Sequence, residues 1–216
     1  MTRPDLVIFD CDGVLVDSEP ITNRMIRDDL AGRGLTLSEA EIDRRFVGGT
    51  MRGVAEEATA LGAEIPDDWV AQFYEKLYAR LAEGTPAIPG VETVLDRLDA
   101  AGIHYCVGSN GSPRKMAITL GQHPRLHDRL KYRLYSAHTL GTAKPDPGLY
   151  LAAARGMGVP AHRATVIDDS PSGCRAARRA GMRCFGYAAH HDGARLAAEG
   201  AIVFHNMAEL PALLGI

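Results

Sequence analysis

Lysine and cysteine are both scarce in this chain, and no apolar run is long enough to span a membrane. There are only four lysines and four cysteines among 216 residues. The cysteines form no C-x-x-C pair, so we expect buried free thiols and neither disulfides nor a zinc site. The net charge of -3 provides no basic excess of the kind that neutralises a nucleic-acid backbone. We therefore expect no nucleic-acid partner.

We expect no targeting signal at the beginning of the chain. Residues 6–9 form a four-residue apolar run, far shorter than the apolar segment of a signal peptide or a spanning helix. We therefore expect a cytoplasmic protein without a membrane partner. With 216 residues, 46% of them hydrophobic, the chain is long enough for one core and a modest insertion. We expect it to act as a monomer.

Short runs of β-branched or aromatic residues alternate with helical patterns along most of the chain. Apolar residues within 91–98 follow the i, i+3, i+4, i+7 spacing of an amphipathic helix. Further helices are expected to start at Asp146-Pro147, with Pro147 in the first helical position, and at Ser172. This alternation predicts an α/β fold with a doubly wound parallel sheet and a Rossmann-like core. The predicted strands are Leu6–Phe9, Tyr105–Val107, Tyr132–Tyr135, Ala164–Ile167 and Cys184–Tyr187.

One long segment, residues 18–86, breaks the alternation, because it has helical patterns and no convincing strand. It is too long for a simple crossover between strands. Ser38-x-x-Glu41 is typical of a helix capping box, and the apolar stripe within 70–81 is expected to be core packing. We therefore predict a helical subdomain at 18–86, inserted into an α/β core made of residues 1–17 and 87–216.

Polar side chains follow several of the predicted strands at the point where each strand ends. The carboxyl ends of parallel strands meet at one edge of the sheet, and ligands bind there. Carboxylates gathered at one edge repel one another, and a hard divalent cation with oxygen ligands, best Mg²⁺, relieves this repulsion. A single D-x-D would be weak support, since aspartate is common in turns, but here the motifs coincide. The residues are Asp10, Asp12, Ser109, Asn110, Lys144, Asp168 and Asp169.

The order and spacing of these residues resemble the four motifs of the haloacid dehalogenase superfamily. Asp10-x-Asp12-Gly13-x-x-x-Asp17 is similar to the first motif, and Ser109-Asn110, Lys144-Pro145 and Asp168-Asp169 are similar to the others. The insertion resembles the helical cap of the phosphoglucomutase-like branch. The second and third motifs, with Lys115-Met116, further resemble bacterial sugar-phosphate phosphatases of the 6-phosphogluconate type. The resemblance implies a magnesium-dependent phosphatase of small phosphorylated metabolites, with sugar phosphates as the expected substrates.

The resemblance also implies roles in the chemistry and in metal binding. Asp10 would attack phosphorus and form an aspartyl-phosphate, and Asp12 would act as the general acid and base. The Mg²⁺ ligands would be Asp10, the Asp12 carbonyl, and a carboxylate of the fourth motif. The resemblance favours Asp169 for that position, with Asp168 holding a metal-bound water or orienting the shell, although the sequence alone does not rank the two.

A second set of residues would bind the substrate. Ser109 and the main chain of Asn110 would donate hydrogen bonds to the phosphoryl oxygens, and Lys144 would balance the charge of Asp10 and of the phosphoryl group. In the cap, Gly48 and Arg52 are candidates for substrate specificity, because paired glycines allow close backbone approach.

Three other functions compete with hydrolysis of phosphate esters. A sugar-phosphate mutase would use the same nucleophile, but a cap histidine takes part in the resembling mutases. Thr22 stands near that position here, and threonine cannot relay a proton as imidazole does, which favours hydrolysis. A receiver domain phosphorylated on aspartate is the non-enzymatic alternative, and the insertion and Asp12 argue against it. A dehalogenase would have the second aspartate replaced, so Asp12 argues against that function too.

Overall fold

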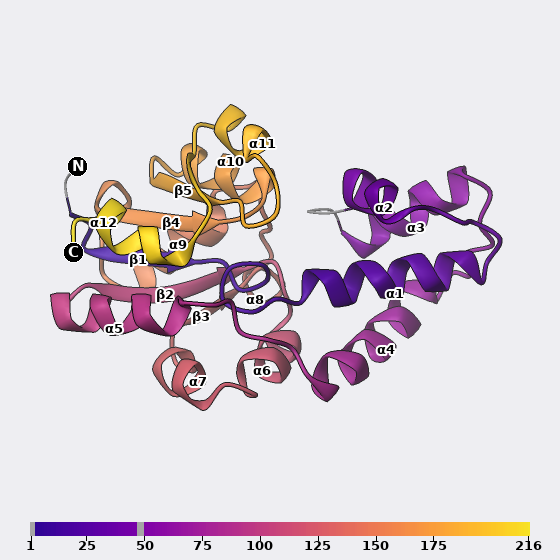
Figure 1. Ribbon diagram of the computed structural model, residues 1–216, viewed down its shortest axis with the longest axis horizontal. Coiled ribbons are helices and arrows are strands. Elements are labelled where there is room, and N and C mark those ends of the chain that lie inside the picture. The colour runs from indigo at the N-terminus through magenta and orange to yellow at the C-terminus, as the bar shows by residue number, and fades with distance from the viewer. Residues whose placement is uncertain (1–2, 47–49) are drawn as a thin grey trace. The chain divides into compact units, whose positions relative to one another are not determined.

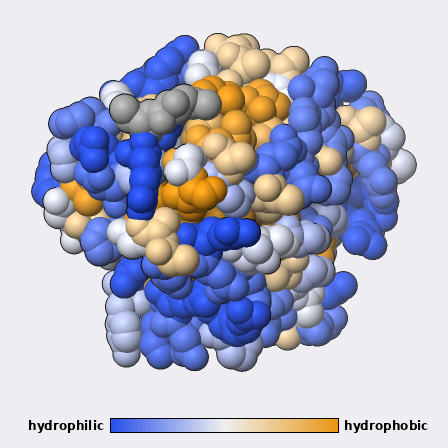
Figure 2. All heavy atoms as spheres, turned by 60° about the vertical axis from the view of Figure 1, so that its left-hand side comes forward, coloured by the Kyte–Doolittle hydropathy of each residue, from blue (hydrophilic) through white to orange (hydrophobic). Residues whose placement is uncertain are grey.

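The computed structural model describes residues 3–46 and 50–216 of the chain (Figure 1). The chain divides into two compact units, one made of Met1–Val16 and Pro86–Ile216, the other of Asp17–Thr85. None of the helices in the described ranges combines the length and the apolar character that a membrane span needs. On the face shown in Figure 2, hydrophilic residues predominate and the apolar areas between them are smaller.

The first unit is built on a parallel sheet, which has six strands within the described residues, in the order β3-β2-β1-β4-β5-β6. This confirms the predicted α/β fold. At the centre, β1 (Leu6–Phe9) pairs with β2 (His104–Ser109) on one side and with β4 (Ala164–Asp168) on the other. The strand order reverses between β1 and β4, and such switch points are where open α/β sheets bind ligands. The remaining strands are β3 (Leu134–Ser136), β5 (Arg183–Tyr187) and β6 (Ile202–Phe204).

Two details of the strand prediction are wrong. The edge strand β6 was not predicted, because its three residues are apolar but form a run too short to distinguish a strand from other structure by its pattern. The predicted third strand starts too early, because Tyr132 is 90% exposed and pairing begins only at Leu134. Aromatic character alone therefore placed Tyr132 in a strand that it precedes.

Helices cover both faces of the sheet (Figure 1), which explains why β1 is a continuous apolar run. Alternate residues of β1 contribute to two separate cores, Val7 and Phe9 to one, Leu6 and Ile8 to the other. All four cysteines are buried and free, as predicted. The first core contains residues of α5 (Val91–Ala101), α6 (Pro113–Leu120), α7 (Pro124–Leu130) and α12 (Leu210–Leu214). The second contains residues of α9 (Gly148–Gly156), α10 (Pro171–Arg179) and α11 (Ala194–Ala198).

Helices that follow the strand ends begin at hydroxyl or carboxylate caps. Ser112 Oγ accepts from the Lys115 amide at the start of α6, and Ser170 Oγ accepts from the Gly173 amide at the start of α10. The predicted start of α10 at Ser172 is therefore one residue late, because the helix begins at Pro171. Pro147 is the N-cap of α9 and not its first helical residue, while Asp146 Oδ1 accepts from the Gly148 amide at 2.7 Å.

The second unit contains α1 (Glu19–Ala31), α2 (Glu39–Phe46), α3 (Met51–Ala60) and α4 (Trp69–Glu83). Phe73, Leu77 and Leu81 of α4 are buried, so the predicted apolar stripe is core packing. The predicted capping box is also present, with the Ser38 amide donating to Glu41 Oε2 at 2.9 Å and the Glu41 amide donating to Ser38 Oγ at 3.3 Å.

The short elements of the first unit are α8 (Ala137–Leu140), η1 (Ala161–Arg163) and η2 (Met207–Glu209).

Candidate functional site

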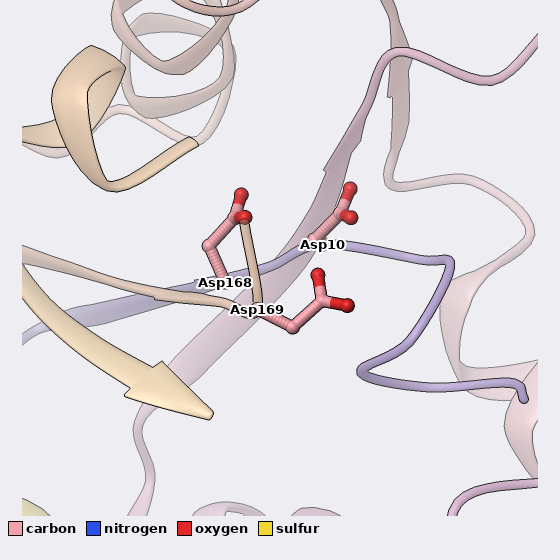
Figure 3. A group of neighbouring side chains, drawn as sticks. All are labelled: Asp10, Asp168 and Asp169. Carbon is pink, nitrogen blue, oxygen red and sulfur yellow. The ribbon is translucent and has the colours of Figure 1, made fainter. Parts of the chain in front are cut away.

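Three carboxylates converge at the carboxyl ends of the two central strands (Figure 3). Asp10 follows β1, Asp168 is the last residue of β4, and Asp169 is the next residue. One oxygen atom of each lies within 4.8 Å of the other two. Asp10 and Asp168 are buried, so little water separates their charges. The group lies at the switch point of the sheet, where its residue types could hold a divalent cation.

Lys144 brings a positive charge into this group from the loop before α9. Its Nζ lies 2.7 Å from Asp10 Oδ1 and 2.8 Å from Asp168 Oδ2. The side chain is only 3% exposed, so Lys144 is a buried residue and not a surface lysine. Burial alone would lower the pKa of Lys144, but the two carboxylates raise it above its ordinary value, and the ammonium stays charged.

The oxygens of Asp168 are fully engaged by residues of the protein. Oδ2 accepts from Lys144 Nζ and from the Tyr150 hydroxyl. Oδ1 accepts from the Ser170 amide at 2.8 Å and from Ser170 Oγ at 2.7 Å. Burial would raise the pKa of Asp168, but Lys144 and these hydrogen bonds hold it below its usual range. Asp168 is therefore an ionised carboxylate with its main acceptor positions occupied.

The negative charge of Asp10 is neutralised less completely than that of Asp168. Burial raises the pKa of Asp10 to about 7, and the charges of Asp168 and Asp12 add to this effect while Lys144 opposes it. One ammonium shared between two buried carboxylates thus leaves negative charge to be neutralised. A divalent cation beside Asp10 would supply the missing positive charge, so the donor set fits a metal with oxygen ligands.

Two glycines allow the main chain to pass close to these carboxylates. A Cβ atom on Gly13 would lie 1.9 Å from Asp169 Oδ2, and φ at Gly13 is +75°. A Cβ atom on Gly173 would lie 1.8 Å from Asp168 Oδ2. Any larger residue at either position would displace the carboxylate beside it.

The end of β2 forms a loop that is tied to its neighbours. Ser109 is buried, and its Oγ accepts from the Gly111 amide at 2.9 Å. The Gly111 carbonyl accepts from Ser136 Oγ at 2.7 Å. Asn110 uses its side chain on the main chain of Lys144, whose amide donates to Asn110 Oδ1 at 2.9 Å. The second and third motifs are therefore joined directly.

Asp12 has a different partner from the other carboxylates. Its Oδ1 lies 2.9 Å from Lys115 Nζ, and the side chains of both residues are mostly buried, at 19% and 15% exposed. Burial lowers the pKa of Lys115, but Asp12 more than offsets this and the pKa lies above its ordinary value. Within the described residues, the group of converging carboxylates does not include the Asp12 side chain.

The structure thus joins Asp10, Lys144, Asp168 and Asp169 in one cluster, and it links Asn110 to Lys144. Of the two cap candidates, Arg52 is an exposed residue of α3, and Gly48 lies outside the described residues. Sequence reasoning missed Tyr150 and gave no role to Lys115. Tyr150 lies in an apolar helical stretch whose pattern is typical of core packing. Only its hydroxyl group could have indicated a polar partner.

Similar proteins support the fold and show the family of the chain. The haloacid dehalogenase-like hydrolase family matches residues 4–181. The 6-phosphogluconate phosphatase of Escherichia coli (strain K12) is 31% identical over 215 residues, which cover 99% of this chain and 96% of that protein.

Two solved structures are similar along their whole length. A haloacid dehalogenase-like protein of unknown function from Agrobacterium tumefaciens str. C58 superposes with a TM-score of 0.89 at 32% identity, covering 98% of this chain and 97% of that chain. A family hydrolase from Deinococcus radiodurans R1, with bound phosphate and sodium, has a TM-score of 0.84 at 32% identity, covering 100% and 96%.

The chain belongs to the haloacid dehalogenase-like hydrolases, which confirms the resemblance seen in its motifs. Within that family it is a phosphohydrolase.

Proposed function

We propose that this protein is a magnesium-dependent phosphatase that hydrolyses sugar phosphates and related small phosphomonoesters through an aspartyl-phosphate on Asp10. The observation that carries the proposal is the position of Lys144 Nζ between Asp10 and Asp168 at the switch point of the sheet, beside Asp169. Phosphoryl transfer depends on positioning and on stabilising the charge of the transferring group. The buried carboxylates, the buried ammonium and the neighbouring loop with the Ser109 hydroxyl can serve both purposes.

Asp10 is the proposed nucleophile. One of its oxygens forms a bond to phosphorus while the bond between phosphorus and the ester oxygen breaks. Lys144, held at 2.7 Å, orients the Asp10 carboxylate and offsets the charge of the phosphoryl group. Because Lys144 is 3% exposed, this charge acts with little screening by water.

Asp12 is the proposed acid and base. It gives a proton to the departing alkoxide in the first step. In the second step it takes a proton from the water that attacks phosphorus, the bond to Asp10 breaks, and inorganic phosphate leaves. Asp12 follows Asp10 by two residues but turns its carboxylate toward Lys115, so the two carboxylates have separate surroundings that suit separate roles.

The phosphoryl oxygens are proposed to bind at the end of β2. The Ser109 hydroxyl and the Asn110 amide would donate hydrogen bonds to them. The N-terminus of α6, capped by Ser112, begins in the same loop and adds a favourable dipole. The hydrogen bond from Ser136 to the Gly111 carbonyl holds this loop, so the donors need little rearrangement when the substrate binds.

Asp10, Asp169 and the Asp12 carbonyl are the proposed metal ligands. Asp168 already accepts from Lys144, Tyr150 and Ser170, which leaves Asp169 as the better ligand of the fourth motif. Asp168 would act indirectly, by orienting Lys144 and the shell around the metal. When bound, Mg²⁺ would supply positive charge to the carboxylates and to the phosphoryl oxygens.

Sugar phosphates are the proposed substrates, because the E. coli relative is a 6-phosphogluconate phosphatase that aligns over nearly the whole chain. The inserted unit, with Arg52 and Gly48, is proposed to act as a cap that contributes specificity. The chemistry uses residues of one chain, so we further propose a monomer, acting in the cytoplasm where phosphorylated metabolites are made.

The test is a screen of phosphate release over a panel of sugar phosphates, phosphoglycolate and phosphorylated serine. It is run with Mg²⁺, after removal of metal by chelator, and after Mg²⁺ is added back. We expect hydrolysis only with metal present. Full activity after exhaustive chelation would reject the metal, and absence of phosphate release from every substrate would reject the function.

A further inference from the structure

Lys115 and Lys144 differ from the other two lysines of the chain in their burial. Their side chains are 15% and 3% exposed, whereas those of Lys76 and Lys131 are 59% and 36% exposed. Burying an ammonium is costly unless it is paired. Lys144 pairs with Asp10 and Asp168, and Lys115 pairs with Asp12. Each buried lysine therefore serves a different carboxylate of the first motif.

We propose that Lys115 is a positioning residue that holds the Asp12 carboxylate in the orientation needed for its acid and base role. This inference rests on the proposed function of Asp12. Its direct support is the contact of 2.9 Å between Lys115 Nζ and Asp12 Oδ1.

The main chain at both ends of this pair is fixed. On the lysine side, the Lys115 amide donates to Ser112 Oγ at 3.1 Å, and the Lys115 carbonyl accepts from Thr119 Oγ1 at 3.1 Å. On the aspartate side, Asp12 forms an isolated bridge with Val16, and the Gly13 amide donates to the Val16 carbonyl at 2.8 Å. The ion pair therefore joins two segments whose main chains are hydrogen-bonded, and it restricts a side chain that could otherwise rotate.

Gly111 lies beside both members of the Lys115–Asp12 pair. A Cβ atom on Gly111 would lie 3.1 Å from Ser109 Oγ, 3.4 Å from Asp12 Oδ2 and 3.7 Å from Lys115 Cδ. The lysine stem thus passes over the loop that is proposed to bind phosphate. The Asp12 carboxylate lies next to that loop, where the proposed mechanism needs the acid, and it is not part of the carboxylate cluster around Asp10.

Charge adds a second reason for the pair. The charge of Asp12 acts on Asp10, and an unpaired Asp12 would oppose the approach of a phosphate dianion. Lys115 offsets that charge locally. Lys144 is already engaged with Asp10 and Asp168, so it is poorly placed to serve Asp12 as well.

The role predicts a dependence on the leaving group. A sugar alkoxide leaves poorly unless it is protonated, while 4-nitrophenolate leaves well without a proton. Misplacing Asp12 should therefore slow the hydrolysis of a sugar phosphate far more than that of 4-nitrophenyl phosphate. Simple structural damage to the core would slow both to the same extent.

The experiment compares Lys115→Met, Lys115→Gln and Lys115→Arg with the wild type on both substrates at saturating Mg²⁺. For Met and Gln we expect kcat on the sugar phosphate to fall about 100-fold, with less than about a tenfold fall on 4-nitrophenyl phosphate, because general acid catalysis contributes on this scale. KM should change little, and Arg should restore most of the rate. Lys131→Met, which removes the exposed pair with Asp128, is the matched control and should leave both rates unchanged.

A double variant with Asp12→Asn provides a further readout. If Lys115 acts through Asp12, Lys115→Met should cause little additional loss in that background. Equal losses on both substrates, unchanged rates, or a raised KM with unchanged kcat on the sugar phosphate would overturn the proposal. A wild type that hydrolyses neither substrate would overturn the proposed function, and this role with it. Unfolding midpoints show which variants are folded. If Lys115→Met does not fold, the comparison of Lys115→Gln with Lys115→Arg still tests the proposal.

Discussion

Asn110 and Lys144 are joined through the main chain of the lysine. The Lys144 amide donates to Asn110 Oδ1 at 2.9 Å, and Asn110 Nδ2 lies 3.5 Å from the Lys144 carbonyl oxygen. One carboxamide thus spans both polar groups of the residue whose ammonium reaches Asp10. It holds the loop that carries Lys144 against the loop that is proposed to bind phosphate.

Replacing this carboxamide should misplace the ammonium. We predict that Asn110→Ala lowers kcat by about 10- to 100-fold, since small displacements of catalytic groups cost this much. Steady-state kinetics on the best sugar phosphate measures the effect. Lys144→Ala is the reference for complete loss of the ammonium. An Asn110→Ala rate equal to that of the wild type would show that the lysine is held well enough by other contacts.

Asp10→Asn should separate activity from stability. We predict that hydrolysis falls at least about 1,000-fold, because a carboxamide cannot form the acyl-phosphate. The metal-free variant should also be more stable than the metal-free wild type at pH 8. Asp10 has its pKa raised to about 7 in the folded protein, against about 4 when unfolded, so its folded state favours the protonated form.

The sign of this effect follows from linkage. A raised pKa gives stability that is present below about pH 4 and is lost as the pH rises toward about 7. The gain of Asp10→Asn over the wild type should therefore grow between pH 5 and pH 8 in chelator, as measured by thermal unfolding, and added Mg²⁺ should reduce it. If the gain shrinks as the pH rises, burial does not raise the pKa of Asp10 in the folded protein.

The two aspartates of the fourth motif should fail in different ways. Asp168→Asn leaves Lys144 without one of its two carboxylates and disturbs the Tyr150 hydroxyl. Since breaking a buried pair costs about 3–5 kcal/mol, we predict a clearly lowered free energy of unfolding. Asp169→Asn should instead keep the stability of the metal-free protein and weaken Mg²⁺ binding. Denaturant unfolding and calorimetric titration with Mg²⁺ measure the two effects, and the reverse pattern would exchange the roles.

The presence of Thr22 near the position of the mutase histidine leads to a test that separates a phosphatase from a sugar-phosphate mutase. The Thr22 hydroxyl donates at 2.9 Å to the carbonyl of Ser18, the N-cap of α1, so it is engaged at the start of its own helix. We predict that a hexose 1-phosphate releases inorganic phosphate without a bisphosphate activator and without accumulation of hexose 6-phosphate. Following both products over time measures this. Isomer forming much faster than phosphate would identify a mutase.

The sequence by itself determined the positions from which the site is built. Alternating strands and helices predict a parallel sheet, and that sheet alone requires Asp10, Ser109 and Asp168 to share one edge. Each of them directly follows or ends a strand, so no contact had to be known in advance.

Only the tertiary structure decided which partner each carboxylate of the site has. Asp168 differs from Asp169 because Lys144 and Tyr150 reach it from 24 and 18 residues away along the chain. Lys115 similarly reaches Asp12 from α6. Local spacing specifies which edge a residue occupies, but hydrogen bonds and ion pairs depend on side chains from distant segments. Those partners meet only when the helices pack on the sheet.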